Sequence, residues 1–405
     1  MQRHGHQAGG VPCADITVEG GLVCEHVPGL AGHAGGATPS LAPSQSASQS
    51  AHGQGPFCSY GVAAVKGWRE EMEDSWAVHP KMELGALHAS YFGVFDGHGG
   101  SCVSDYLMLH LHEGISREAA GSDGTELATC ISRAFTSLDK ALIDPSAARE
   151  LEELCYARLG AEASVKHLGG LAGRRRRELL KAKIMRRARE LSPLTSEQLA
   201  LVDAELAAID EERLNDDAIE TGSTAVVLVA DAMQHDCYRL TVANLGDSRA
   251  VLSEGSVTAL SRDHTPTDAD EYDRIIAAGA TVNRYGRICP LGLNLSRSFG
   301  DHACKDAGLP PHEQAVSPVP EVTSIDIRGS KRSGGHSFVV LASDGVWNML
   351  DNEEVSRLVL DLLSPSPTAE ELAEVARKLC IACTAPSPDD VNGTDNITVL
   401  LVYFD

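Results

Sequence analysis

Two apolar runs of the chain lead directly into an aspartate followed by a glycine. In FGVFDGHGG the run ends at Asp96, Gly97 and His98, and in VVLASDGVWN it ends at Asp344. A strand can fix the carboxylate, while the glycine lets backbone carbonyls approach a cation closely. Carboxylate, carbonyl and water oxygens are the ligands that Mg²⁺ and Mn²⁺ prefer. These two junctions are therefore candidate ligands of a hard divalent metal ion.

Two further clusters could contribute to the same chemistry. GWREEMED places Arg69 shortly before the adjacent acids Glu73 and Asp74, and GTDNITVLL opens the last apolar run with Asp395. Each cluster alone has an ordinary explanation, because Asp-Gly is a common turn signal. Neighbouring residues on a regular strand also point to opposite faces, so Glu73 and Asp74 could serve one site only at a strand end or through water. The joint occurrence of the clusters, rather than any one of them, favours a functional site.

Charge and composition restrict the partners. The 405 residues carry a formal net charge of -23, from 57 acidic side chains against 34 Lys and Arg, and 43% of the residues are hydrophobic. This apolar content allows one large domain or two ordinary ones. An acidic surface repels nucleic acid and anionic membranes, so we expect neither as a partner. Part of the acidity could instead belong to carboxylates that hold cations.

Targeting signals and cysteines indicate the compartment. No apolar run approaches the ~18–20 residues of a membrane span, and MQRHGHQAGG lacks the apolar region of a signal peptide. Eleven irregularly spaced cysteines favour a reducing compartment over a disulfide scaffold. We therefore expect a soluble intracellular protein, located in the cytoplasm, the nucleus or both.

The elements that must position these residues alternate between strands and helices. Short β-rich runs, several apolar at consecutive positions, lie at 60–67, 88–95, 223–230, 237–245, 249–255, 336–343 and 396–404. Helical periodicity appears at 103–115, 126–142, 268–279, 352–363 and 369–380. This order predicts a layered α+β domain in which helices cover the outer faces of sheets.

Two segments fall outside this pattern. Residues 1–56 are rich in Gly, Ser, Ala and His, a composition that predicts a disordered low-complexity tail. Residues from about 144 to 219 contain the basic stretch GRRRRELLKAKIMRRARE and then an acidic helical stretch. A charged helical hairpin is the simplest interpretation of this insert, and a docking arm or a localisation signal is the alternative.

The motifs taken in order resemble the type 2C family of metal-dependent serine/threonine protein phosphatases. The series is GWREEMED, FDGHGG, TGSTAVVLV, NLGDSRAVL, DHTP, AAGATV, LSRSFGD, ASDGVW and TDNITVLLV. The resemblance covers about residues 57–405, excluding the insert, which would make this range the catalytic domain. It implies an antiparallel β-sandwich of two sheets flanked by helix pairs, in four layers (α-β-β-α), with the metals at one edge between the sheets. It also implies a monomer that acts on phosphoproteins.

The resemblance implies a role for each metal-binding position. Asp96 would bridge two Mn²⁺ or Mg²⁺ ions, and the Gly97 carbonyl would be a ligand of one of them. Asp344 and Asp395 would complete the protein ligands of the first metal. Asp247 of GDSR would help to form a weaker third metal site.

The remaining residues would handle water, phosphate and the leaving group. Glu73 and Asp74 would hold coordinated waters, Arg69 would bind the substrate phosphate, and His98 would protonate the leaving seryl or threonyl oxygen as general acid. A hydroxide shared by the two metals would attack phosphorus in line. Arginine offers a forked donor that matches phosphate geometry, and histidine titrates near neutral pH.

The sequence departs from the family pattern at two places. Asn348 stands where the pattern Asp-Gly-x-Trp-Asp has its second aspartate, which predicts a weaker third metal. The stretch NRYGRICPLGLNLSRSFGD also differs from the usual run before the Ser-Arg element, which could alter a flap beside the site. A catalytically inactive scaffold that binds a kinase or regulator is the alternative function. Such scaffolds typically lose a metal-binding acid or the phosphate arginine, and this chain keeps them all.

Overall fold

The computed structural model describes most of the predicted catalytic range. The described residues are 17–19, 48–85, 87–121, 126–144, 147, 150–151, 153–154, 221–233, 237–289, 292–306, 308–330 and 335–405. Nearly all of the predicted charged insert, and most of the predicted tail, lies outside these residues. The proposed division of the chain into a tail, a catalytic domain and an insert therefore stays a prediction.

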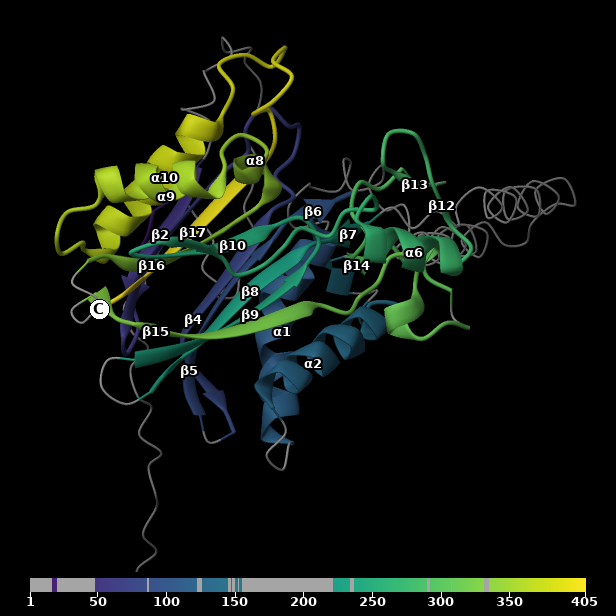
Figure 1. The fold of residues 1–405 in the computed structure, drawn as a ribbon, viewed down its shortest axis with the longest axis horizontal. Helices are drawn as coiled ribbons and strands as arrows, with labels where there is room; N and C mark the ends of the chain where they lie inside the picture. The colour runs from purple at the N-terminus through teal and green to yellow at the C-terminus, as the bar shows by residue number, and fades with distance from the viewer. Residues whose placement is uncertain are drawn as a thin grey trace, which may run out of the picture.

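Two antiparallel sheets form the centre of the molecule (Figure 1). The larger has the order β1-β2-β3-β17-β16-β10-β11, with β1 (Thr17–Glu19), β2 (Ser48–Gln54), β3 (Cys58–Val65), β17 (Ile397–Phe404), β16 (Ser337–Ala342), β10 (Arg249–Glu254) and β11 (Val257–Ala259). The smaller has the order β15-β9-β8-β5-β4, with β15 (Glu321–Arg328), β9 (Cys237–Leu245), β8 (Ala225–Ala232), β5 (Leu87–Phe95) and β4 (Ser75–Leu84).

The central strands of both sheets bury both of their faces. Along β5, Phe92 and Val94 belong to the core between the sheets, whereas Tyr91 and Phe95 belong to the core under the first helices. This alternation on a strand that is buried on both sides explains why β5, like β17, reads as a continuous apolar run. The consecutive apolar positions of these strands were predicted, and the structure confirms the α+β class with antiparallel sheets.

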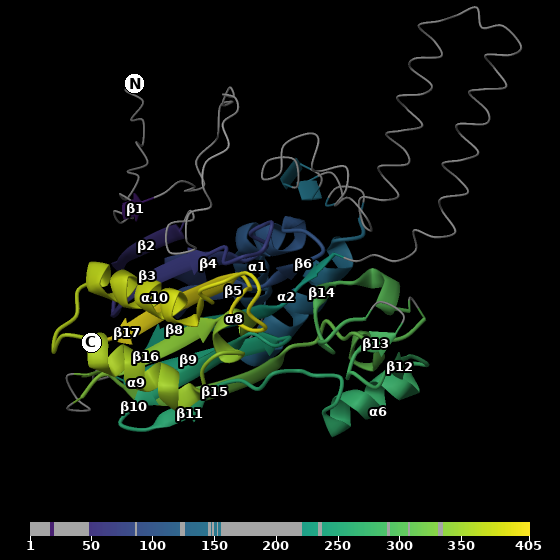
Figure 2. The same cartoon turned by 90° about the horizontal axis from the view of Figure 1, so that it is seen from above.

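Helices cover the outer faces of the two sheets. The helices α1 (Cys102–Ala120) and α2 (Leu127–Ala141) pack on the smaller sheet, and α8 (Asp344–Trp347), α9 (Asn352–Leu362) and α10 (Ala369–Cys383) pack on the larger one. Figures 1 and 2 show α9 and α10 on one side of the sheets, and α1 and α2 on the other. The layers follow the order helix, sheet, sheet, helix. No helix among the described residues is long and apolar enough to cross a membrane.

A third group of elements lies at one end of the sandwich. It contains the short strands β6 (Gly97–His98), β7 (Gly222–Ser223) and β14 (Phe299–Gly300), the hairpin β12 (Thr281–Val282) and β13 (Ile288–Cys289), the helix α6 (Ala269–Ala277), and the 3₁₀ turns η3 (His302–Cys304) and η4 (Pro311–Glu313). Residues 264–289 and 292–297, called the flap below, pack around Ile275 and Ile288 in a small core that they share with Val316. The flap therefore forms a separate packing unit beside the sheets.

Three of the longer strands differ from the sequence analysis, and so does the short β1. Residues 17–19 and 48–54, predicted to belong to a disordered tail, form β1 and β2. Strand β2 pairs with both β1 and β3 and buries Ala51. The polar composition concealed β2, because backbone pairing with neighbouring strands needs little apolar surface. The sequence analysis also missed β4, which contains Pro80 and a register shift after His79, and β15, whose side chains are mostly exposed. Proline, a bulge and weak alternation each obscure a strand pattern.

Candidate active site

The ends of strands from both sheets bring the predicted acids together. Asp96 follows β5 of the smaller sheet, whereas Asp344 follows β16 and Asp395 precedes β17 in the larger one. The amide of Asp96 donates to Thr224 Oγ1 at 3.1 Å, which ties the end of β5 to the start of β8. The sheets are packed face to face, so these strand ends meet at one edge of the sandwich.

Five carboxyl groups influence one another at this edge. The carboxyl groups of Asp96 and Asp344 lie close enough for each to affect the pKa of the other. Burial, followed by the charges of Asp74, Asp344, Asp247 and Asp395, raises the pKa of Asp96 well above its ordinary value. The structure thus places the predicted aspartates in one electrostatic cluster, although they come from five separate parts of the chain.

The other members of the cluster are perturbed in the same direction. Burial raises the pKa of Asp74 to about 7 against the hydrogen bonds that it accepts, and the charges of Asp395 and Asp344 add to the effect. Burial and the charge of Asp344 raise the pKa of Asp247 to about 7. Burial and the charge of Asp395 raise the pKa of Asp344 itself to about 6. Ionised together, these groups repel one another and would be relieved by cations.

Glu73 and Asp74 lie immediately before β4, at a strand end. Asp74 Oδ2 accepts from Ser343 Oγ at 2.9 Å and from Thr398 Oγ1 at 2.7 Å. Glu73 Oε1 accepts from the amide of Gly100 at 2.5 Å. Burial raises the pKa of Glu73 despite this hydrogen bond. The adjacent acids therefore have different partners around the same edge.

Gly97 occupies a position that has no room for a side chain. A Cβ atom there would lie 2.4 Å from the carbonyl oxygen of Glu73. Gly97 also begins β6, which pairs with β7. The absence of a side chain lets the backbone of β6 pass close to the carbonyl of Glu73.

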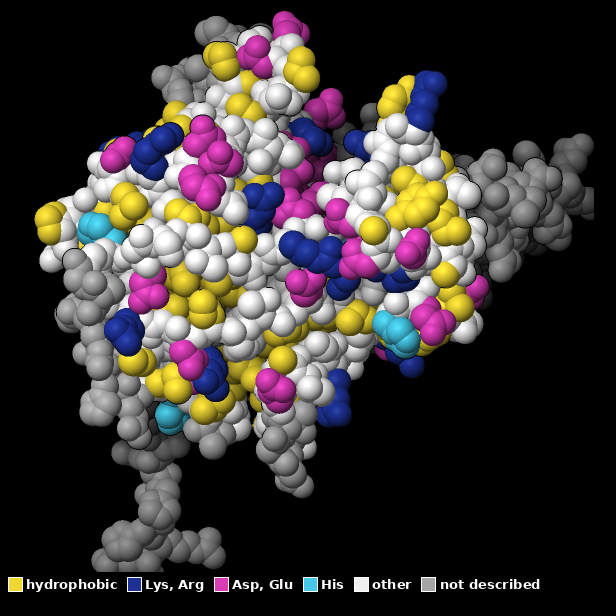
Figure 3. All heavy atoms as spheres, in the orientation of Figure 1, with side chains coloured by type: hydrophobic (Ala, Val, Ile, Leu, Met, Phe, Trp, Pro, Cys, Tyr) yellow, Lys and Arg dark blue, Asp and Glu magenta, His cyan; other side chains and the backbone are white. Residues whose placement is uncertain are grey.

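Arg69 and Asn348 each contact a predicted metal ligand. An Nη atom of Arg69 lies 2.6 Å from Asp395 Oδ2, and about half of the Arg69 side chain (53%) is exposed. Asn348 Nδ2 donates to Asp344 Oδ2 at 3.0 Å. Figure 3 shows acidic and basic side chains on the walls of a hollow between the surfaces that carry α8 and the β12–β13 hairpin. A cationic, exposed group thus stands beside the buried carboxylates.

His98 pairs with an aspartate to which the sequence analysis gave no role. His98 Nε2 lies 2.8 Å from Asp301 Oδ2 and 3.0 Å from Asp301 Oδ1. Burial opposes the charged form of His98, but the charge and the hydrogen bond of Asp301 outweigh it and raise the pKa of His98. Burial likewise opposes ionisation of Asp301, yet His98 and Ser298 hold the pKa of Asp301 below its ordinary value. LSRSFGD was noticed as a motif, but no local signal identified its last residue as the partner of a histidine 203 positions away.

Asn396 is a second functional neighbour that the sequence did not single out. Its Oδ1 accepts from the amide of Glu73 at 2.7 Å, and its Nδ2 donates to the carbonyls of Lys66 and Glu71 at 2.8 and 2.9 Å. This side chain holds the loop that carries Arg69 and Glu73 against the start of β17. The only feature of the sequence that could have identified Asn396 is its position directly after Asp395.

The donor set fits a hard divalent cation. Among the described residues, no three His, Cys, Asp or Glu side chains have the spacing of a ready-made metal site. The clustered donors are nevertheless all carboxylate oxygens, apart from the backbone at Gly97, and such oxygens suit Mg²⁺ and Mn²⁺ rather than zinc. The pKa values of Asp96, Asp74, Asp247 and Asp344 are raised by burial and by neighbouring carboxylates. A bound cation would offset this repulsion.

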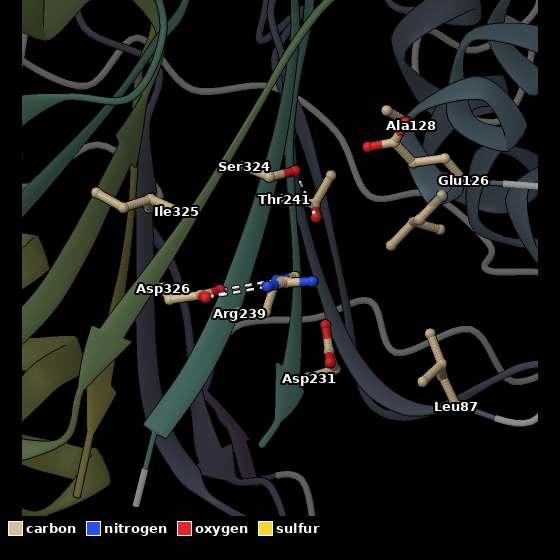
Figure 4. Close-up of a pocket in the computed structure, with 10 residues that line it drawn as sticks. Leu87, Glu126, Ala128, Asp231, Arg239, Thr241, Ser324, Ile325 and Asp326 are labelled. Atoms are coloured by element: carbon tan, nitrogen blue, oxygen red, sulfur yellow. Dashed lines mark hydrogen bonds and ion pairs between the residues drawn. The ribbon is translucent and has the colours of Figure 1, made fainter. Parts of the chain in front are cut away.

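A separate pocket lies away from this site. It has a volume of about 560 Å³ and is lined by residues of β5, β8, β9 and β15 and by the start of α2, among them Leu87 and Asp231 (Figure 4). Leu87 begins β5 and Asp96 follows its end, so the pocket lies at the opposite end of the smaller sheet. Arg239 in its wall is bound to Asp326. None of the predicted site residues lines this pocket.

Comparison with known proteins gives the family. A sequence model of Protein phosphatase 2C matches residues 58–165 and 151–387. "Probable protein phosphatase 2C 60" of Arabidopsis thaliana is 32% identical over 348 residues, which cover 85% of this chain and 86% of the relative. "Probable protein phosphatase 2C 11" of Oryza sativa subsp. japonica is 31% identical over 347 residues, which cover 85% of this chain and 84% of the relative.

A solved structure supports the fold independently of close sequence identity. A phosphatase from a pathogenic strain of Toxoplasma gondii aligns with a TM-score of 0.58 at 21% identity, over 87% of this chain and 94% of that one. The family match spans most of the described catalytic range, including both Asp96 and Asp344. The chain therefore belongs to the protein phosphatase 2C family of serine/threonine phosphatases.

Proposed function

We propose that this chain hydrolyses phosphoserine and phosphothreonine in proteins with the help of two Mn²⁺ or Mg²⁺ ions. The observation that carries the proposal is the cluster of carboxyl groups around Asp96, with raised pKa values and with Arg69 and His98 beside it. The relatives named above as phosphatases support the same reaction. Each of the residues that an inactive scaffold would be expected to lose is present.

The metal ligands would come from the strand ends. Asp96 would bridge the two ions, and the backbone carbonyl of Gly97 would contact one of them. Asp344 and Asp395 would complete the set, with Glu73 and Asp74 acting through water, and Asp247 would serve a weaker third site. Bound cations would make a water molecule acidic enough to attack at neutral pH and would neutralise the phosphoryl oxygens.

The side chains around the cluster would handle the substrate. Arg69 is exposed enough to meet a phosphate and offers a planar fork of donors. Its contact with Asp395 would hold it at the edge of the cluster until a phosphate arrives. His98 would give a proton to the departing seryl or threonyl oxygen, because an alkoxide is a poor leaving group.

The proposal is tested by phosphate release from a phosphothreonine peptide with Mn²⁺, with Mg²⁺ and with EDTA. Wild-type protein should release phosphate only with metal. Loss of a residue that merely supports a metal ligand costs about 10–100-fold, so Asp96→Asn and Asp344→Asn should each lose more than about 100-fold. Asp326→Asn, which removes an exposed acid far from the cluster, is the matched control and should keep full activity. The proposal would be wrong if folded wild-type protein released no phosphate with either metal.

A further inference from the structure

The pair of His98 and Asp301 is built across a small sheet. β7 lies between β6 and β14, and in this register Gly222 stands opposite both His98 and Gly300. Asp301 follows Gly300 directly and is fully buried, whereas 27% of the His98 side chain is exposed. The carboxylate therefore approaches the imidazole from the protein interior, and the other side of the ring is left towards solvent.

Asp301 is fixed by its backbone as well as by its side chain. Its φ of 46° is left-handed, and it is the only non-glycine residue in the described part of the chain with a positive φ. The amide of Asp301 donates to the carbonyl of Thr221 at 3.0 Å, and Ser298 Oγ donates to Asp301 Oδ2. A conformation that costs about 1 kcal/mol or more persists only where the surroundings determine it, and such residues cluster at functional sites.

Gly222 leaves the space in which the pair meets. A Cβ atom at this position would lie 2.3 Å from Asp301 Oδ2 and 2.6 Å from His98 Nε2. Neither distance is compatible with the observed hydrogen bond. The residue of β7 that lies between His98 and Asp301 must therefore have no side chain. The pair depends on Gly222 at this position.

Helix α2 stabilises the turn that carries Asp301 through hydrogen bonds to Asp139. Asp139 Oδ1 accepts from the amide of Gly300 at 2.9 Å and from Lys305 Nζ at 2.8 Å. Lys305 Nζ also donates to the carbonyl of Ser298 at 2.9 Å. These groups give the turn a fixed support on the helix layer.

We propose that Asp301 is a positioning residue for His98. The Asp301 carboxylate accepts a hydrogen bond from His98 Nε2–H, which leaves Nδ1 as the ring nitrogen that donates a proton to the leaving oxygen. This role rests on the proposed phosphatase function. As the bond from phosphorus to the seryl or threonyl oxygen breaks, water supplies the new oxygen on phosphorus. The Nδ1 proton moves to the departing oxygen to give a neutral alcohol, and His98 keeps its Nε2–H on Asp301. The attacking water gives up one proton as it becomes a phosphate oxygen, and His98 Nδ1 regains a proton through solvent.

Asp301→Asn is the variant that separates positioning from folding. Asparagine tolerates the left-handed conformation better than most residues and has the same shape as aspartate, so the turn should persist. The variant and wild type are compared with Mn²⁺ on a phosphothreonine peptide and on 4-nitrophenyl phosphate. The first substrate has a poor leaving group that needs a proton, and the second has a good one that does not.

The expected result is a loss that depends on the leaving group. On the peptide, kcat should fall about 100-fold or more, because a positioned general acid contributes on this scale. On 4-nitrophenyl phosphate, kcat should stay within about threefold of wild type, because no proton has to be supplied. A structural disturbance of the metal cluster would lower both rates alike. Equal losses on the two substrates, or no loss on either, would overturn the positioning role.

Two further variants keep the test decisive if Asp301→Asn does not fold. Ser298→Ala removes only one hydrogen bond to Asp301 and should lower peptide turnover about 3–10-fold, with 4-nitrophenyl phosphate turnover unchanged. Gly222→Ala should show a larger selective loss, because the methyl group would separate the pair. Ser356→Ala, which breaks a buried serine–serine hydrogen bond distant from the site, is the control and should leave both rates unchanged.

Failure of the positioning role is distinguishable from failure of the proposed function. If wild-type protein hydrolyses neither substrate with Mn²⁺, the proposed function fails, and this role fails with it. If wild-type protein hydrolyses both substrates and Ser298→Ala and Asp301→Asn leave the ratio of the two rates unchanged, only the positioning role fails.

Discussion

At the scale of single residues, the acidic cluster is the least stable part of the metal-free protein. Asp74 is buried, Asp96 and Asp344 are half-buried, and the three lie close enough for their charges to raise pKa values within the group. Burying a carboxylate without a cationic partner lowers the stability of the fold, and the nearby hydrogen-bond donors offset only part of this desolvation cost. The arrangement is therefore better suited to binding cations than to stabilising the fold.

Asp344→Asn should stabilise the metal-free protein. The pKa of Asp344 is about 6 in the folded protein and 3.8 as a free side chain, so the folded state holds the proton more tightly. Its contribution to stability is complete below about pH 4 and is lost as the pH rises through about 6. The gain in the free energy of unfolding should be near zero at pH 4 and about 1–3 kcal/mol at pH 8, measured by urea unfolding in EDTA. Asp326→Asn should show no such pH-dependent gain, and a gain for Asp344→Asn that shrinks towards pH 8 would contradict the account.

Asn348→Asp should have opposite effects with and without metal. The amide of Asn348 donates to Asp344, and an aspartate would replace this hydrogen bond with repulsion. The melting temperature in EDTA should therefore fall. With Mn²⁺, the added charge should strengthen a weak additional site, seen as one further binding event by isothermal titration calorimetry. An unchanged Mn²⁺ binding curve would remove the basis for linking Asn348 to a third metal.

The sequence predicted the acids of the site because each stands beside a strong strand pattern. Asp96, Asp344 and Asp395 each had a local signal in the adjacent apolar run, although only the joint occurrence of the clusters favoured a functional site. Asp301 had no such signal, because its role depends on a left-handed turn and on a partner from a distant strand. Gly222 was equally invisible, since only the register of three short strands places it against the pair.

At the scale of elements, a buried acid joins helix α6 of the flap to the end of the flap. Glu271 of α6 is fully buried and accepts from Arg297, from Arg274 and from Ser296 Oγ. Burial opposes its charge, but the two arginines and the serine hold the pKa of Glu271 well below its ordinary value. Arg297 belongs to the segment that ends at Asp301. The flap and the His98–Asp301 pair are thus connected through one stretch of backbone.

Glu271→Gln should loosen the flap more than the core. Removing one partner of a buried charge pair costs about 3–5 kcal/mol, because the remaining arginines lose their counter-charge. Hydrogen exchange of the flap should accelerate, while exchange in β8 and β17 should change little. Asp270→Asn, on the neighbouring exposed position of α6, is the control and should leave flap exchange near the wild-type rate. Uniform acceleration across the sheets would show that the flap is not a separate unit.

The strands that escaped prediction share a physical cause. β2, β4 and β15 are edge or near-edge elements of their sheets, where backbone pairing rather than side-chain burial supplies much of the stability. Central strands such as β8 and β17 bury both faces and leave a strong apolar signal. Periodicity therefore identifies the centre of a sheet more reliably than its margins.

At the scale of the whole molecule, three cores hold four layers together. One core lies between the sheets, and one lies under each helix group. The active-site acids come from strand ends in both sheets, so the core between the sheets fixes their mutual position. The layer order followed from the family resemblance, whereas periodicity alone indicated only sheets covered by helices. The role of the charged insert stays a prediction.

A chain that starts at Ser48 should be more stable than one that starts at Phe57. The shorter chain lacks β2, which pairs with β3 along seven residues and contributes Ala51 to the core between the sheets. The free energy of unfolding should fall by about 2 kcal/mol or more. This is the combined contribution expected from burying one side chain and from the hydrogen bonds between β2 and β3. Chemical unfolding of both chains measures it. Equal stability would show that β2 contributes nothing to the domain and would restore the predicted boundary at residue 57.

The most direct test of the central claim is phosphate release from a phosphothreonine peptide as a function of free Mn²⁺, measured on the wild-type chain. We predict no release in EDTA, a saturable rise with Mn²⁺, and two ions bound per chain at saturation. Release that is independent of metal, or none from folded protein at saturating Mn²⁺, would contradict the account.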